Sequence, residues 1–168
     1  MDSYAVQLML AGRMTQPDRI FTIGHSNRDA DAFLAVLRAS GVERLVDVRS
    51  MPRSHFEHFR CEALAQWLPA AGIEYIWMGD TLGGLRTGGY ARWMGTPQFA
   101  TGLARLEDLA RERPTAFMCA ERDPARCHRR YIASALRDRG WDVRHLIDVG
   151  KTVAAAEIAT QLPLDLPS

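Results

Sequence analysis

The chain has 168 residues, of which 47% are hydrophobic and 24% are charged, a composition typical of a soluble globular protein with one sizeable core. Its formal net charge of +1 provides no overall field that would attract it to nucleic acid or to a membrane surface. No apolar stretch approaches the roughly 20 residues that span a bilayer, and three cysteines are too few for a secreted disulfide scaffold, so a cytoplasmic protein is favoured.

The N-terminal segment lies outside the regular pattern of the chain. It reads MDSYAVQLMLAGRM and carries Asp2 where a signal peptide would have an early basic cluster. We therefore expect a flexible or non-core arm at 1–18 and a single α/β domain at 19–168. Deletion of residues 1–13 is expected to leave stability nearly unchanged.

From residue 19 onward, short β-rich runs alternate with amphipathic helical patterns. Strands are predicted near 20–24, 43–48, 73–77, 115–120 and 142–147. Helices are predicted at 29–41, 61–68, 96–113 and 123–140, with a weak final helix at 152–161. This alternation predicts an α/β fold of three layers, with a mainly parallel five-stranded sheet and helices on both faces in a Rossmann-like arrangement.

Particular residues set the expected helix boundaries. Ser26 or Asn27 is a natural N-cap for the first helix, and Thr96 and Asp123 for two later ones. The helix at 61–68 is expected to stop near Pro69 and Gly72. Residues 79–96 hold six glycines and indicate a mobile loop, and a loop of this length in a compact domain is often a lid.

Chemically equipped segments follow the predicted strands. Because the carboxyl ends of parallel strands meet at one edge, where open α/β folds bind ligands, we expect a site there. In particular, we expect His25, Asp47, Glu121 and His128 to line one pocket. The candidate catalytic residues are Cys127, His128, Cys119, Asp47, Glu121 and His25. The candidate ligand-binding residues are Arg49, Arg53, Ser26, Asn27, Arg126, Arg129, Gly83 and Gly84.

The segment MCAERDPARCHRR, residues 118–130, contains the densest chemistry. Cys119 is expected at the end of a buried strand, where an inert buried cysteine explains it as well as a reactive one does. Cys127 is expected near the first turn of the next helix, where the helix N-terminus, Arg126 and His128 would favour a thiolate.

Other members of the candidate set have structural explanations too. His128 beside a helix N-terminus should be hard to protonate, which suits a neutral hydrogen-bonding or ligand role, although it could face solvent. One of Arg129 and Arg130 is expected to turn inward and pair with Glu121 or Asp47. Asp47 could be a base, a metal ligand, or a structural partner of an arginine.

Four segments occur in an order that resembles a known family. TIGHSN, LVDVRSMPRS, LGG after the third strand and CAERDPARCHR are similar to the hallmark segments of domain-of-unknown-function family 488, across roughly residues 20 to 148. The resemblance implies a small single-domain α/β protein of bacteria or archaea. It implies no reaction and no cofactor.

Three functional classes fit these residues. We favour an enzyme that acts on an anionic or phosphorylated small molecule through a Cys/His/Arg site. A nucleotide- or nucleic-acid-binding module without catalysis is less favoured, because the net charge is near neutral, although arginines and the aromatic residues Tyr90 and Trp93 could serve it. A metal site could use Cys119, Cys127 and His128 with His25 or Asp47, but the paired Cys-x-x-Cys spacing of structural zinc is absent.

Overall fold

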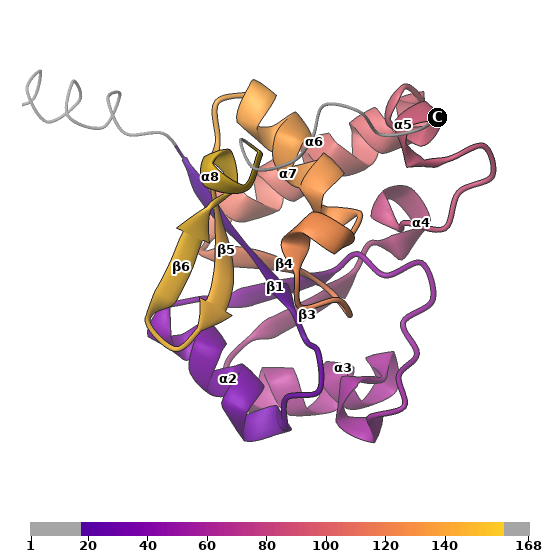
Figure 1. Ribbon diagram of the computed structural model, residues 1–168. Helices are drawn as coiled ribbons and strands as arrows, with labels where there is room; N and C mark the ends of the chain where they lie inside the picture. Colours follow the sequence, from indigo (N-terminus) through magenta and orange to yellow (C-terminus); the bar gives the residue numbers. More distant parts are fainter. Residues whose placement is uncertain (1–17, 160–168) are drawn as a thin grey trace, which may run out of the picture.

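A central sheet organises the part of the chain that the computed structural model describes, residues 18–159 (Figure 1). The sheet has six strands in the order β3-β2-β4-β1-β5-β6. Its strands are β1 (Arg19–Gly24), β2 (Arg44–Asp47), β3 (Glu74–Trp77), β4 (Thr115–Cys119), β5 (Asp142–Asp148) and β6 (Lys151–Ala154). The strands β1 to β5 pair in parallel, and β6 pairs antiparallel with β5. The α/β fold with a mainly parallel sheet is thereby confirmed.

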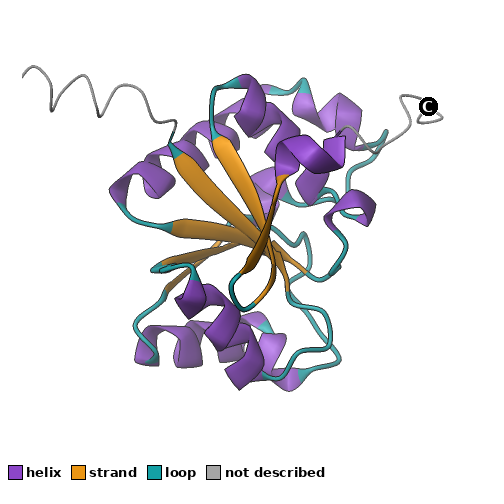
Figure 2. Cartoon of the chain, turned by 60° about the vertical axis from the view of Figure 1, so that its left-hand side comes forward, coloured by secondary structure: helices purple, strands orange, loops and turns teal. Residues whose placement is uncertain are grey.

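Helices cover both faces of the sheet (Figure 2). On one face, α2 (Ala30–Ala39) and α3 (Cys61–Ala70) pack Phe33, Leu37 and Leu64 against buried strand residues. On the other face, α6 (Pro97–Glu112) and α7 (Arg129–Asp138) contribute most of the helical side chains to a second core. The shorter elements are η1 (Glu57–Phe59), α4 (Gly79–Leu82), α5 (Tyr90–Met94), η2 (Pro124–Arg126) and α8 (Ala155–Ala159).

The sheet differs from the prediction in strand number and order. The sheet has six strands rather than five, because residues 151–154 form the edge strand β6 where a weak helix was predicted over 152–161. Only α8 remains of that helix within the described residues. The strand β4 lies between β2 and β1, so the order is not the Rossmann order 3-2-1-4-5-6.

The observed helix boundaries agree with some of the predicted capping residues and differ from others. Thr96 caps α6 as expected, because its hydroxyl oxygen accepts a hydrogen bond from the backbone N–H of Phe99. Asp29, rather than Ser26 or Asn27, caps α2. The helix α3 ends at Ala70, one residue after Pro69 and two before Gly72, as expected.

The glycine-rich segment 79–96 contains regular structure where an irregular loop was predicted. It contains α4 and α5, which are linked by a bond from the Tyr90 hydroxyl to the carbonyl of Leu82, 2.9 Å long. Arg86 lies over the ring of Trp93 at 3.7 Å and donates to the carbonyl of Gly83. The expected mobile loop therefore consists of two short helices joined by specific contacts.

The strand order creates a crevice at the carboxyl edge. The chain leaves β2 toward the face covered by α3, and it leaves the neighbouring strand β4 toward the face covered by α7 (Figure 1). Where adjacent parallel strands send their connections to opposite faces, a crevice opens between the connections. The topology thus predisposes the ends of β2 and β4 to form a site.

None of the helices within 18–159 is long and apolar enough to cross a bilayer. The predicted N-terminal arm falls almost wholly on residues 1–17, which lie outside the described residues.

Candidate functional site at the carboxyl edge

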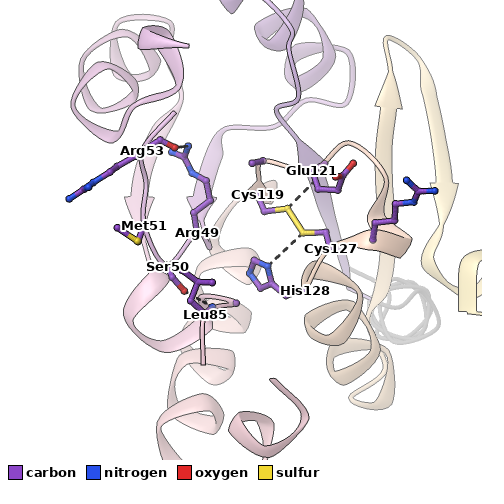
Figure 3. Close-up of a pocket in the computed structure, with 12 residues that line it drawn as sticks. Arg49, Ser50, Met51, Arg53, Leu85, Cys119, Glu121, Cys127 and His128 are labelled. Atoms are coloured by element: carbon purple, nitrogen blue, oxygen red, sulfur yellow. Dashed lines mark hydrogen bonds between the residues drawn. A yellow bond between two sulfur atoms is a disulfide. The ribbon is translucent and has the colours of Figure 1, made fainter. Parts of the chain in front are cut away.

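A cavity of about 430 Å³ lies at the carboxyl edge of the sheet (Figure 3). Three segments form it: the loop after β2, the loop after α4, and the segment from the end of β4 to the start of α7. The lining residues are Arg49, Ser50, Met51, Arg53, Gly84, Leu85, Cys119, Ala120, Glu121, Arg126, Cys127 and His128. The candidate residues from the second and fourth strand ends therefore meet in one place.

Two cysteine sulfurs lie together in the wall of this cavity. Cys119 ends β4, Cys127 follows η2, and the two form a disulfide (Figure 3). Cys127 was predicted near the first turn of a helix capped by Asp123, but it directly precedes the N-cap of a helix that starts later. Asp123 caps only the short η2, and α7 begins at Arg129 with His128 as its N-cap.

The sulfur of Cys127 nevertheless faces the N-terminus of α7. The backbone N–H of Arg129 points to the Cys127 Sγ at 3.5 Å. Free N–H groups and the positive end of the helix dipole favour negative charge at this position. In the reduced protein they would stabilise a Cys127 thiolate, as the sequence suggested, although through a different local geometry.

His128 presents an unprotonated nitrogen to Cys127. Its Nε2 donates to the carbonyl of Val48 at 2.9 Å, which assigns the ring proton to Nε2. The remaining nitrogen, Nδ1, lies 3.6 Å from the Cys127 Sγ. Burial lowers the pKa of His128, and the backbone bonds to Val48 and Leu82 oppose this only in part. A neutral imidazole whose Nδ1 lies next to a thiol can accept the thiol proton.

Arg129 is buried behind the cysteine pair and does not line the cavity. Its Nε donates to the Cys119 Sγ at 3.1 Å, and its Nη1 donates to the hydroxyl of Thr22 at 2.7 Å. Its Nη2 donates to the backbone carbonyl of Glu121. The prediction of a side-chain pair with Glu121 or Asp47 is wrong. Arg129 is the inward-facing arginine of the pair, but it contacts sulfur and neutral oxygens.

Asp47 forms a closed ion pair instead of facing the cavity. Its carboxylate is fully buried and receives two side-chain bonds from Arg49, 2.8 and 2.7 Å long, and one from the Tyr75 hydroxyl, 2.6 Å long. Burial opposes the charge of Arg49, but the bond and charge of Asp47 outweigh it and raise the pKa of Arg49. Asp47 therefore positions Arg49, which lines the cavity.

The Gly-His-Ser-Asn turn lies beside the cavity but does not line it. His25 stacks on Phe59, donates from Nδ1 to the carbonyl of Ser26, and turns its Nε2 toward Arg49 at 3.4 Å. Burial lowers the pKa of His25 to about 4. Ser26 has a positive φ of 51°, and its hydroxyl donates to the side-chain oxygen of the exposed Asn27 at 3.4 Å. Contrary to the prediction of one shared pocket, His25 and Asp47 support Arg49 from behind.

Charged side chains and glycines form the rim. The side chain of Arg126 is 80% exposed and lies 3.6 Å from Asp123. Arg53 is also exposed, and Figure 3 shows its side chain pointing away from the cysteine pair. A Cβ at Gly84 would lie 2.8 Å from the ring of His128, and one at Gly83 would collide with Ser50. The two glycines thus allow close packing, and only Gly84 lines the cavity.

Several contributors were not predicted from the sequence. Ser50, Met51, Leu85 and Ala120 line the cavity, and Ser50 also accepts a bond from the backbone N–H of Leu85 at 2.9 Å. Ser50 and Met51 lie within the LVDVRSMPRS segment, so extending the candidate set along that segment would have found them. Leu85 and Ala120 carry no chemical signal that could have singled them out.

A metal-ligand set is present in part. Donor atoms of Cys119, Cys127 and His128 lie within 4.8 Å of one another. The residues expected to complete the set are directed elsewhere, because Asp47 binds Arg49 and Tyr75 and His25 stacks on Phe59. The two sulfurs are joined to each other, so the disulfide form offers only the Nδ1 of His128 as a strong ligand.

The aromatic residues considered for base stacking are occupied. Tyr90 is buried and packs against Phe99, His128 and Tyr131. Trp93 lies under Arg86 and donates its indole N–H to the carbonyl of Thr81 at 2.7 Å. Neither ring presents the open face that stacking of a nucleic-acid base requires.

Comparison with known proteins gives one match. The family model described as "Domain of unknown function DUF488" matches residues 29–136. No curated protein and no solved structure matches the chain.

Proposed function

We propose a chemistry for this site from the starting point that the chain belongs to the DUF488 family, whose description assigns no reaction. The protein is a cysteine-dependent enzyme that acts on an anionic, for example phosphorylated, small molecule. In its reduced form Cys127 is the nucleophile and His128 is its base. Arginines at the cavity rim recognise the anionic group of the substrate.

The contact between Cys127 and His128 carries this proposal. The Nδ1 of His128 lies 3.6 Å from the Cys127 Sγ, and the bond from Nε2 to Val48 keeps that nitrogen unprotonated. A thiol is activated when a base within reach accepts its proton and a helix N-terminus stabilises the resulting charge. Both conditions meet at Cys127, since the N–H of Arg129 also points to its sulfur.

Anion recognition is supported by the charge around the cavity. Arg49, Arg53 and Arg126 line it together with one acid, Glu121. Asp47 neutralises Arg49, which leaves Arg53 and Arg126 as exposed guanidinium groups that can bind a carboxylate or a phosphate. A cavity of about 430 Å³ fits a small molecule better than a polymer. The reduced thiol that the chemistry needs agrees with a cytoplasmic location, which is part of this proposal.

Alkylation of the reduced protein tests the proposal. We expect iodoacetamide to modify Cys127 well below pH 8 and faster than Cys61, and inorganic phosphate or sulfate to slow the modification of Cys127 alone. Cys61 is the internal control, because its pKa is raised, mainly by burial and also by the hydrogen bond and the negative charge of Glu62. Slow labelling of Cys127 that anions do not change would contradict the proposal.

Cys127→Ser provides the matched variant. It should keep the fold, since serine is nearly isosteric with cysteine, and should lose any activity that depends on the sulfur. Cys119→Ser should instead cost stability, because it buries a hydroxyl where a less polar thiol was tolerated. If Cys127→Ser retained full turnover of a substrate identified by screening, Cys127 would not be the nucleophile.

A further inference from the structure

Arg129 is a buried cation whose hydrogen-bond partners in the described chain are neutral oxygen atoms and one cysteine sulfur. It is 1% exposed. Its donors bind the Cys119 Sγ, the hydroxyl of Thr22, and the carbonyls of Glu121 and Arg122. Within residues 18–159 it forms no salt bridge with a carboxylate, whereas the other buried arginines, Arg44 and Arg49, each form at least one.

A buried charge without a counter-charge is costly, because neutral partners replace only part of the lost hydration. Glu121 and Asp123 attract Arg129 from beyond contact distance, and Arg28 repels it. The Thr22 hydroxyl also contacts the Nδ1 of His145 at 2.7 Å, and burial keeps that imidazole neutral. Among the groups in contact with Arg129, only Cys119 can become an anion.

We propose that Cys119 and Cys127 form a redox-active thiol–disulfide couple, with Arg129 as the counter-ion of the Cys119 thiolate, and that the reduced couple reduces the disulfide of an anionic low-molecular-weight thiol. This inference rests on the proposed function and names its substrate class. It gives Cys119 a role as the second, resolving thiol, where the sequence left an inert cysteine equally well supported.

The chemistry balances in two exchange steps. The Cys127 thiolate attacks one sulfur of the substrate disulfide RS–SR, the S–S bond breaks, and one RS⁻ leaves and takes up a proton. The Cys119 thiolate then attacks the Cys127 sulfur of the mixed disulfide and releases the second RS⁻, which also takes up a proton. Two electrons pass from the cysteine pair to the substrate, and the pair becomes the disulfide that the structure contains.

The placement of the two sulfurs fits these roles. Cys127 faces His128 and the helix N-terminus, which suits the thiol that attacks first. Cys119 is 3% exposed, against 7% for Cys127, and is held by Arg129 at 3.1 Å, which suits the thiol that reacts second. Arg129 stabilises the thiolate and loses that counter-charge in the disulfide, so it favours the reduced form of the couple.

Oxidised glutathione, an anionic disulfide, tests the couple in the reduced Cys61→Ser protein. We expect release of two equivalents of glutathione per chain and an internal disulfide without a lasting adduct. Cys119→Ser should release one equivalent and stop as a glutathione adduct on Cys127. Cys127→Ser should react at least about tenfold more slowly. Accumulation of the adduct in the protein that retains both cysteines would overturn the assignment of Cys119.

A pair of arginine variants tests the counter-ion. In redox equilibrium with the glutathione couple, Arg129→Gln should shift the pair toward the disulfide by about tenfold, a change that corresponds to one lost charge-assisted contact. Arg130→Gln, on the adjacent and partly exposed residue, should leave the equilibrium unchanged. Equal behaviour of the two variants would overturn the role of Arg129. If Arg129→Gln does not fold, the cysteine variants still decide the exchange mechanism.

The outcomes separate this inference from the proposed function. If Cys127 labels rapidly and phosphate protects it, but glutathione disulfide yields no internal disulfide, the proposed function stands and the redox couple fails. If Cys127 labels slowly under all conditions, both fail. If the reduced protein holds a stoichiometric metal ion whose removal is needed before either thiol reacts, the cluster is a metal site and the redox assignment is overturned.

Discussion

Two buried arginines at the carboxyl edge differ in what neutralises them. Arg49, two residues past the end of β2, is clamped by the Asp47 carboxylate, which the Tyr75 hydroxyl also binds. Arg129, at the start of α7, contacts a sulfur, a hydroxyl and carbonyls. The Asp47 pair raises the pKa of Arg49, whereas burial lowers the pKa of Arg129 to about 10.

This difference separates a structural group from a functional one. The charge of Arg49 is satisfied within the fold and needs nothing from a ligand. The charge of Arg129 is satisfied only if a neighbouring group becomes an anion, and the neighbour that can do so is the sulfur of Cys119. Perturbed buried charges cluster at functional sites, and Arg129 lies directly behind the two cysteines that line the cavity.

The largest expected effect is on the Asp47–Arg49 side of the comparison. Asp47→Asn leaves the Arg49 guanidinium buried without its counter-charge, so we expect the free energy of unfolding to fall by about 3–5 kcal/mol. Urea denaturation measures it. Asp123→Asn is the control, because that side chain is 51% exposed and asparagine caps as well as aspartate. A loss below about 1 kcal/mol would show that Asp47 is not essential to the pairing.

Acid should destabilise the protein through two buried histidines. Burial lowers the pKa of both His25 and His145 to about 4. Their stabilising contribution is complete above the unfolded pKa of about 6.5 and is lost as the pH falls toward 4, because only the unfolded chain takes up the protons readily. We expect a loss of about 3 kcal/mol per histidine over this interval.

Substitutions of single histidines show which of them causes this pH dependence of the unfolding free energy. His145→Gln should flatten the slope of unfolding free energy against pH, whatever its effect at neutral pH, while substitution of the exposed His55 should not change it. A slope that is identical in all three proteins would exclude His145 as a source.

Beside Arg129, His128 should control how fast Cys127 reacts with iodoacetamide. His128→Gln removes the base whose Nδ1 faces Cys127, so iodoacetamide should modify Cys127 of the reduced protein about tenfold more slowly at pH 7. The labelling rate of Cys61 in the same sample corrects for any change in reagent or folding. An unchanged rate at Cys127 would leave the helix N-terminus as the sole activating group.

The smallest expected effect is at the rim. Arg126 is exposed, and exposed charge pairs contribute little, so Arg126→Gln should weaken phosphate protection of Cys127 by only about threefold. Arg122→Gln is the matched control, because Arg122 is exposed nearby but does not line the cavity. Equal protection in both variants would remove Arg126 from the binding site.

The sequence predicted the strand pattern and the edge of the sheet at which the cavity lies, because both follow from local signals. Hydrophobic periodicity marked β1 to β5, and the parallel order made Arg49, Glu121, Cys127 and His128 converge. The strand β6 was mistaken for a helix because the alanines at 154–156 favour a helix locally, and only pairing with β5 decides the outcome.

Side-chain directions could not be predicted in the same way. The Asp123-Pro124 pair has the sequence of a helix start, but it begins only the short η2, and this shifts Cys127 out of the helix. Whether Arg129 or Arg130 turns inward depends on that shift. Arg49 is only two residues from Asp47 in sequence, but the bond from the Tyr75 hydroxyl to Asp47 depends on packing between β2 and β3, which no local motif encodes.

The pH dependence of alkylation tests the central claim most directly, because it compares an activated thiol with an ordinary one in a single chain. In the fully reduced protein, the rates of iodoacetamide modification at Cys127 and Cys61 are measured across a pH series by peptide mass spectrometry. We predict a midpoint for Cys127 well below the ordinary thiol value of about 8.5, and a midpoint for Cys61 above it, since burial and Glu62 raise its pKa. Coincident profiles for the two cysteines would contradict the account.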